Sequence, residues 1–274
     1  MSELKNKITS PFSFSQTSLQ DYADCARRFQ LRYVEQLSWP AIESEPVLEN
    51  ERRQQEGQVF HRLVQQQLIG LPVEKLTRLA SSPDLSRWWE NYLHHQPDLT
   101  GFTLYPELTL SVRLSQYRLV AKYDLVAVIP GSHVLIFDWK TYRKRPKDEW
   151  MAARWQTRIY RALLVEAGSH LNGSTGISPE QIEMTYWYAD FPAEPFKLSY
   201  NSTQFKRDWD AITKIVKEID GLREFPMTDD LQKCEYCSYR SYCERGSSTG
   251  TNGESESELD EVDINLEQVQ EIEF

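Results

Sequence analysis

The sequence predicts an α/β fold in which a mixed central sheet is flanked by helices. Three observations favour this class: helical periodicity in the first 96 residues, three β-rich segments between residues 103 and 141, and a helix–strand–helix order from there to residue 222. The 274 residues, 40% of them hydrophobic, can bury a large core. We expect one domain over residues 1–246, with additional helices at its N-terminal and C-terminal ends.

The first part of the chain predicts helices. Leu19, Tyr22 and Leu31 belong to an apolar series at helical spacing, and Ser15 is one of several residues that can cap its start. Gly70-Leu71-Pro72 ends a second helical pattern. The predicted boundaries are 14–36 for the first helix, 52–69 for the second, and two short helices within 73–96, with a connector at 39–50.

The middle of the chain predicts strands joined by hairpins. Residues 103–114, 117–129 and 133–141 are rich in β-branched and aromatic side chains. Ser115-Gln116 and Pro130-Gly131 separate them as turns, so we expect three consecutive strands.

The last part of the folded chain predicts a helix, a strand and another helix. Trp155, Ile159 and Leu163 form part of an apolar stripe. The boundaries are 149–167 for the helix, 181–189 for the strand and 203–222 for the final helix, which a Cys-rich loop follows.

Charge is distributed unevenly along the chain. The formal net charge is −10, but nine of the 41 acidic residues lie in 247–274, which has no Lys or Arg. The remaining body is almost neutral, so charge neither requires nor excludes a nucleic-acid partner. We expect the acidic tail to be disordered. No signal peptide and no apolar run of membrane-spanning length is present, which favours a cytoplasmic protein with no membrane partner.

Four cysteines are arranged in an uneven pattern. Cys25 stands alone, whereas Cys234, Cys237 and Cys243 form a C-x2-C-x5-C run. Four thiolates suit either an iron–sulfur cluster or tetrahedral zinc, and the spacing alone does not distinguish them. In a reducing compartment, metal ligation is favoured over disulfides. A shared centre would connect the two ends of the domain.

Two acidic residues lie within apolar, strand-forming segments. Asp124 occurs in L-V-A-K-Y-D-L-V-A-V, and Asp138 occurs in V-L-I-F-D-W-K-T. In a strand, Asp138 and Lys140 point to the same face and Trp139 to the other. Two carboxylates can bind Mg²⁺ or Mn²⁺, and a nearby Lys can orient a water or stabilise negative charge. The structural alternative for each Asp is an edge-strand or Arg-paired carboxylate.

These motifs together resemble the PD-(D/E)XK nuclease superfamily, in particular its RecB/AddB-like branch, which also includes iron–sulfur nucleases of CRISPR adaptation. The resemblance covers residues 14–245. It includes S-L-Q-D-Y-A-D-C-A-R-R-F-Q-L-R-Y, E-G-Q-V-F-H, Y-D-L-V-A-V, D-W-K-T, W-Q-T-R-I-Y and the closing cysteine run, all in the family's order. Ala26, Ala121 and Ser238 depart from residues common in the family, but none of them removes a ligand.

The resemblance implies a restriction-endonuclease-like core and a role for each matching residue. Asp124, Asp138 and Lys140 would be catalytic, and the metal ligands would be His61, Asp124, Asp138 and the main-chain carbonyl of Trp139. Gln156 and Tyr160 would contact DNA or support Lys140. It also implies that a 4Fe–4S cluster, rather than the alternative Zn²⁺, occupies Cys25, Cys234, Cys237 and Cys243.

The sequence therefore predicts a metal-dependent DNA nuclease, an exonuclease acting on single-stranded ends in repair or a related pathway. The alternative is a non-catalytic module that binds DNA ends within a repair or CRISPR adaptation complex. No G-x4-G-K-[S/T] loop is present, so any unwinding requires a separate helicase partner.

Overall fold

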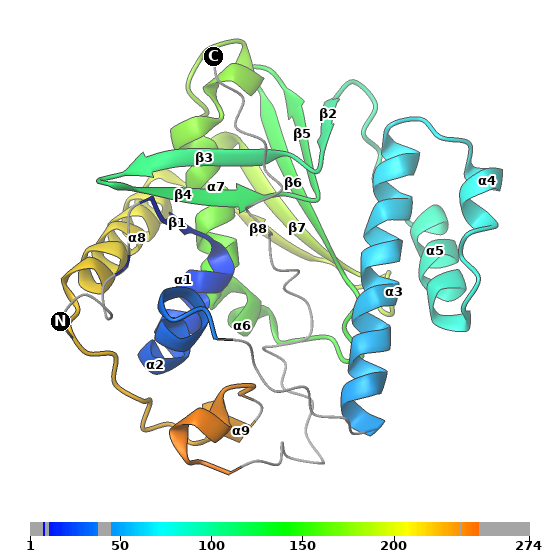
Figure 1. The fold of residues 1–274 in the computed structure, drawn as a ribbon. Coiled ribbons are helices and arrows are strands. Elements are labelled where there is room, and N and C mark those ends of the chain that lie inside the picture. The colour runs from blue at the N-terminus through cyan, green and yellow to red at the C-terminus, as the bar shows by residue number, and fades with distance from the viewer. Residues whose placement is uncertain (1–7, 9–10, 38–44, 236, 247–274) are drawn as a thin grey trace.

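The computed structural model describes residues 8, 11–37, 45–235 and 237–246 (Figure 1). The predicted acidic tail at 247–274 and the first half of the predicted connector, residues 39–44, lie outside these residues. Among the described helices, none has the length and apolar character needed to cross a bilayer.

The predicted first helix is divided in the structure. After the short strand β1 (Ser13–Phe14), helix α1 spans Gln16–Asp24, and α2 (Ala26–Phe29) leads into a π-helical turn at Gln30–Val34. Cys25 interrupts them with an extended backbone, φ −161° and ψ 113°. The prediction of one continuous helix is therefore wrong at Cys25. Ser15 caps α1, as the sequence indicated, by accepting a hydrogen bond from the Ser18 N–H.

The second predicted helix begins earlier than expected. Helix α3 spans Glu45–Leu68, and its start includes Pro46, which the first turn of a helix tolerates. Two short helices follow, as predicted: α4 (Val73–Thr77) and α5 (Pro83–His94). Pro83 occupies the first turn of α5, directly after the Ser82 cap.

The three predicted strands are five strands in two sheets. Segment 103–114 forms β2 (Thr103–Pro106) and β3 (Thr109–Leu114), and segment 117–129 forms β4 (Tyr117–Lys122) and β5 (Leu125–Ile129). Only β6 (His133–Lys140) is one strand, as expected. The three-stranded sheet has the order β1-β4-β3, and the five-stranded sheet has the order β2-β5-β6-β7-β8.

The predicted segments 103–114 and 117–129 are interrupted at positions that lie opposite each other in the hairpin. The Glu107 N–H donates to the Asp124 carbonyl over 2.9 Å, and the Tyr123 N–H donates to the Leu108 carbonyl over 2.8 Å. Glu107 has a φ of +56°, in the left-handed region that few non-glycine residues adopt. The hairpin therefore changes direction here, and Asp124 lies at the junction of the two sheets.

The mixed five-stranded sheet carries helices on both faces. Strand β7 (Ile182–Tyr188) runs parallel to β6, while β5 and β8 (Phe196–Ser199) pair with their neighbours in antiparallel fashion. The sequence did not predict β8. On one face, α7 (Trp155–Ala167) and α8 (Ser202–Gly221) contribute to the main hydrophobic core. On the other face, α3, α4 and α5 build a second core (Figure 1).

Alternation along β6 separates these two cores. Val134 and Ile136 belong to the main core, whereas Phe137 and Trp139 pack in the second core. Asp138 and Lys140 therefore share the face that α7 covers, and Trp139 points away from them, as the sequence predicted.

The predicted helix at 149–167 is also divided. Helix α6 (Asp148–Ala153) ends at Arg154, whose ψ of 149° is extended, and α7 starts directly after it. The predicted continuous helix is wrong at this residue, and the break places Gln156 in the first turn of α7.

The two ends of the domain meet beside α2. Helix α9 (Gln232–Glu235) lies close to α2 in Figure 1. The Arg27 N–H donates to the Pro226 carbonyl over 3.1 Å, and the Tyr239 hydroxyl donates to the Leu37 carbonyl over 3.1 Å. Leu31, Cys237 and Tyr239 form a small apolar cluster there. Protein contacts alone therefore bring the two predicted cysteine segments together.

Candidate active site

The predicted catalytic residues come from several elements that meet at the sheet junction. Asp124 lies between β4 and β5, and Asp138 and Lys140 end β6. His61 is carried by α3 from the opposite layer, and Gln156 by α7. The structure brings all of these predicted residues into one connected set of contacts.

Asp124 connects helix α3 with strand β6. Its Oδ1 lies 3.2 Å from His61 Nδ1, and its Oδ2 accepts a 2.9 Å hydrogen bond from the Trp139 N–H. Burial opposes ionisation of Asp124, but His61, Lys140 and the Trp139 N–H outweigh it and hold its pKa below the usual value. Burial lowers the pKa of His61, but Asp124 more than compensates and raises it to about 9. In the absence of a metal ion, the two side chains therefore form an ion pair.

Asp138 is a buried carboxylate with a cation on one oxygen and an amide on the other. Lys140 Nζ lies 3.0 Å from Asp138 Oδ2, and Gln156 Nε2 donates to Asp138 Oδ1 over 3.0 Å. The side chains of Asp138 and Lys140 are 3% and 5% exposed. Burial, together with the negative charge of Asp124, raises the pKa of Asp138 to about 6, although Lys140 acts in the opposite direction. Asp138 is thus a carboxylate that an additional cation would stabilise.

Tyr160 supports Gln156 from the same helix face. Gln156 Nε2 donates to the Tyr160 hydroxyl over 3.2 Å, and that hydroxyl donates to the Lys122 carbonyl over 2.5 Å. The Tyr123 hydroxyl donates a 2.8 Å hydrogen bond to the Tyr160 carbonyl. The Gln156–Tyr160 pair therefore links Asp138 to the end of β4, next to Asp124. Its direct role in the structure is to orient Asp138.

The donor chemistry of this site fits a hard divalent cation. Two carboxylates and an imidazole are ordinary ligands for Mn²⁺, and carboxylates suit Mg²⁺. Asp138 Oδ2 is buried and pairs with Lys140, and no described residue gives it a hydrogen bond of good geometry. Within the part of the chain that the structure describes, no three His, Cys, Asp or Glu side chains are already arranged as a metal-holding group. Asp124 and His61 contact each other instead, so metal binding would require them to exchange partners.

The four predicted cluster cysteines line one small cavity. Its lining includes Cys25, Cys234, Cys237 and Cys243. All four are free of disulfides. Arg245 Nη1 lies 3.0 Å from Cys234 Sγ, and burial together with the neighbouring Cys25 raises the pKa of Cys243. The sulfurs share a cavity, but they too are not arranged as a ready metal-binding group in the described residues.

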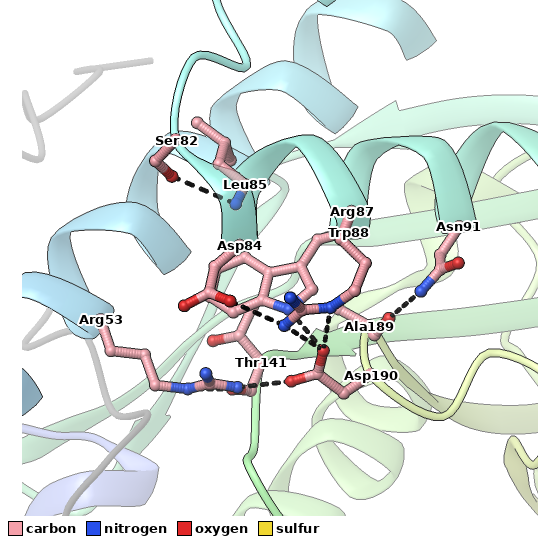
Figure 2. A network of polar contacts seen from close by, with 10 residues as sticks. All are labelled: Arg53, Ser82, Asp84, Leu85, Arg87, Trp88, Asn91, Thr141, Ala189 and Asp190. Atoms are coloured by element: carbon pink, nitrogen blue, oxygen red, sulfur yellow. Dashed lines mark hydrogen bonds and ion pairs between the residues drawn. The ribbon is translucent and has the colours of Figure 1, made fainter.

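A second polar network, which the sequence did not predict, is centred on Asp190, just beyond β7 (Figure 2). Arg53 Nη2 donates to Asp190 Oδ2 over 2.7 Å, and Arg87 Nη2 and Trp88 Nε1 reach Asp190 Oδ1 at 2.8 and 2.9 Å. Arg53 also donates twice to the Thr141 carbonyl, through Nε at 2.9 Å and Nη2 at 2.5 Å. The only part of this network that sequence spacing could indicate is the position of Arg53, because residues 53, 57 and 61 lie on one helix face.

Comparison with known proteins agrees with this geometry at the level of family and fold. The PD-(D/E)XK nuclease superfamily matches residues 13–244. The crystal structure of a candidate exonuclease from Eubacterium rectale superposes with a TM-score of 0.50 at 11% sequence identity, with 91% of each chain covered. The structure of the protein SSO0001 gives a TM-score of 0.41 at 11% identity, covering 88% of this chain and 90% of that one. A search of curated proteins gives no significant match. On the match over residues 13–244, the chain belongs to the PD-(D/E)XK nuclease superfamily.

Proposed function

We propose that this protein is a Mg²⁺- or Mn²⁺-dependent deoxyribonuclease that removes nucleotides from single-stranded DNA ends. The arrangement around Asp138 carries the proposal: Lys140 and Gln156 contact its two oxygens, and Asp124 is bonded to the intervening Trp139. DNA as the substrate follows from membership of the nuclease superfamily. The preference for single-stranded ends is supported by the resemblance to the RecB/AddB-like branch.

Each side chain has a defined task in this proposal. Asp124, Asp138, His61 and the Trp139 main-chain carbonyl hold the divalent ion. When bound, such an ion lowers the pKa of a water ligand and neutralises charge on the phosphate. Lys140 orients the attacking water or stabilises negative charge on the phosphate. Gln156, itself braced by Tyr160, fixes the Asp138 carboxylate so that its Oδ2 faces Lys140.

A cleavage assay on labelled DNA tests this function. Wild type, Asp138→Ala and Lys140→Ala are compared on single-stranded and double-stranded substrates with Mg²⁺ or Mn²⁺. Lys197→Ala is the matched control, because Lys197 lies on β8 with a side chain that is 63% exposed. We expect cleavage by wild type and the control, faster on single strands, and none by the two site variants.

Two outcomes would contradict the proposal. Equal cleavage by all four proteins would indicate a contaminating nuclease. DNA-end binding without cleavage by wild type would instead support the alternative, a non-catalytic module of a repair or CRISPR adaptation complex. Cleavage restricted to duplex DNA would retain the nuclease and remove the single-strand assignment.

We also propose that the four cysteines hold a structural 4Fe–4S cluster, with Zn²⁺ as the alternative. The shared cavity and the lack of disulfides among these cysteines support a soft-metal site, and the family resemblance favours iron over zinc. Holding Cys25 and Cys243 at one centre would reduce the entropy of the unfolded chain.

Metal analysis of anaerobically purified protein tests the cysteine site. We expect a brown protein with iron and sulfide, which Cys25→Ser loses. The control Ser238→Ala, in the cysteine loop itself, should retain them. Stoichiometric zinc in a colourless protein would replace the cluster with the zinc alternative. The absence of both metals would reject the site.

The proposed function includes a partner protein that acts in DNA repair or a related pathway. Because the sequence has no nucleotide-binding phosphate loop, a separate helicase or repair protein would supply single-stranded ends. A reducing, cytoplasmic location would suit four cysteines that form no disulfide.

A further inference from the structure

We infer that a brace between helix α3 and the end of strand β6 positions His61, and that Gly57 and Arg53 therefore act as positioning residues for the divalent ion. The brace consists of Arg53, Gly57, Thr141 and Asp190. This inference rests on the proposed function, because it concerns the same metal site.

The first contact of the brace is a close approach of the Gly57 backbone to the Thr141 side chain. A Cβ atom built on Gly57 would lie 2.9 Å from Thr141 Oγ1, closer than side chains normally approach. Thr141 is 4% exposed and β-branched, so its side chain has little freedom to move aside. Only glycine at residue 57 lets α3 pack this closely against the residue that follows Lys140.

The second contact is a charged clamp one helical turn away. The Arg53 guanidinium binds the Thr141 carbonyl through two nitrogens and the Asp190 carboxylate through one (Figure 2). It also lies over the Trp88 ring, 4.7 Å from the centroid. Arg53 is 9% exposed, and such a planar, multiply bonded group restricts both distance and angle. The clamp attaches α3 to the ends of β6 and β7 together.

These two contacts determine how close His61 lies to Asp124. Arg53, Gly57 and His61 are spaced four residues apart, so they share one face of α3. The same strand end is fixed from the other side, where the Ala189 N–H donates to the Lys140 carbonyl over 2.8 Å. A shift of α3 away from Thr141 would move His61 away from Asp124, now 3.2 Å distant. Small displacements of a ligand-bearing element reduce metal affinity and rate strongly.

Direct titration with Mn²⁺, without DNA, tests the brace. We expect Gly57→Ala to weaken Mn²⁺ binding about tenfold, the effect typical of disturbing the support of a ligand. Adding Thr141→Ala, which removes Oγ1, should restore affinity to that of Thr141→Ala alone. Adding Thr141→Val should not, because valine keeps an atom in the same place. Arg53→Lys should weaken binding in a similar way, since one amine cannot make all three bonds.

Gly221→Ala is the matched control, because no atom lies within 4 Å of the added Cβ at the end of α8. Denaturant unfolding of every variant separates positioning from stability. A brace that serves only stability would lower the free energy of unfolding and leave Mn²⁺ affinity unchanged.

The outcomes distinguish this inference from the proposed function. Wild-type Mn²⁺ affinity in folded Gly57→Ala and Arg53→Lys would overturn the brace while leaving the nuclease proposal intact. If Gly57→Ala does not fold, the Arg53→Lys titration decides. If wild type itself binds no Mn²⁺ and does not cleave DNA, the proposed function fails, and the inference fails with it.

Discussion

The main-chain N–H of Trp139 donates a 2.9 Å hydrogen bond to Asp124 Oδ2 and thereby joins the two segments that carry the candidate metal-binding carboxylates. Asn at residue 124 can still accept this bond, but it carries no charge toward His61 or a metal ion. We therefore expect Asp124→Asn to fold and to lose at least about a hundredfold in cleavage rate. Asp124→Ala should in addition lose about 1–3 kcal/mol of stability, because it leaves the Trp139 N–H unpaired. Wild-type cleavage by Asp124→Asn would exclude this carboxylate from catalysis.

Gln156 offers a test of the support around Asp138. Its amide donates to Asp138 Oδ1 over 3.0 Å, and its side chain is buried. Gln156→Leu keeps the approximate volume and removes that donor, so cleavage should fall about 10–100-fold. Steady-state kinetics should show the loss in kcat, because the carboxylate is misoriented rather than absent. Gln58→Leu, on the exposed side of α3, is the control and should cleave as wild type does. An unchanged kcat in Gln156→Leu would contradict the supporting role.

The Asp190 network predicts a dependence of stability on pH. Burial disfavours the negative charge of Asp190. The interactions with Arg53, Arg87 and Trp88 outweigh burial and hold the pKa of Asp190 below its usual value. A lowered pKa in the folded state adds stability at pH values above the unfolded pKa of about 4, and this stability is lost as pH falls further. Asp190→Asn should therefore cost about 2 kcal/mol at neutral pH. The difference in the free energy of unfolding between wild type and Asp190→Asn should become smaller below about pH 4.

Denaturant unfolding at a series of pH values measures this difference. Glu166→Gln serves as the control, because Glu166 is exposed near the end of α7. A gap between wild type and Asp190→Asn that is independent of pH would show that ionisation of this carboxylate does not stabilise the fold.

A buried ion pair fixes α7, the helix that carries Gln156, against α8. Arg161 Nη2 lies 3.4 Å from Asp208 Oδ2, and their side chains are 3% and 0% exposed. Asp208→Ala would leave the guanidinium without this carboxylate and should destabilise the protein by about 3–5 kcal/mol. The apolar pair Arg161→Met with Asp208→Leu should recover most of that loss, as thermal unfolding can determine. If the double variant is less stable than Asp208→Ala, charge pairing is not the origin of the effect.

Local sequence patterns predicted the elements whose signals are strong and continuous. The α/β order, β6, the two short helices and the placement of Asp138 beside Lys140 follow from periodicity alone. The roles of His61 and Gln156 were predicted from the family resemblance and not from local patterns. Both residues lie on helices, separate from the strand that carries Asp138. The structure places these side chains in contact with the two carboxylates.

The breaks could not be predicted, because tertiary contacts cause them. Segment 117–129 contains no glycine or proline that would signal a break. Segment 103–114 contains Pro106, but the residue that adopts the positive φ is Glu107, a type that does not signal a bend. The break depends on hydrogen bonds between Glu107–Leu108 and Tyr123–Asp124, which form only once the hairpin has closed. Cys25 and Arg154 likewise interrupt helices without glycine or proline. The Arg53–Asp190 pair was missed because its partners are 137 residues apart.

The side chains of the candidate site come from opposite layers, with His61 on α3 and Gln156 on α7 at either face of the sheet. A partly synthesised or partly denatured chain, in which only one layer has docked, cannot assemble them. If the proposed function holds, such an intermediate would not cleave DNA, so incomplete copies of this polypeptide would not cut DNA in an uncontrolled way.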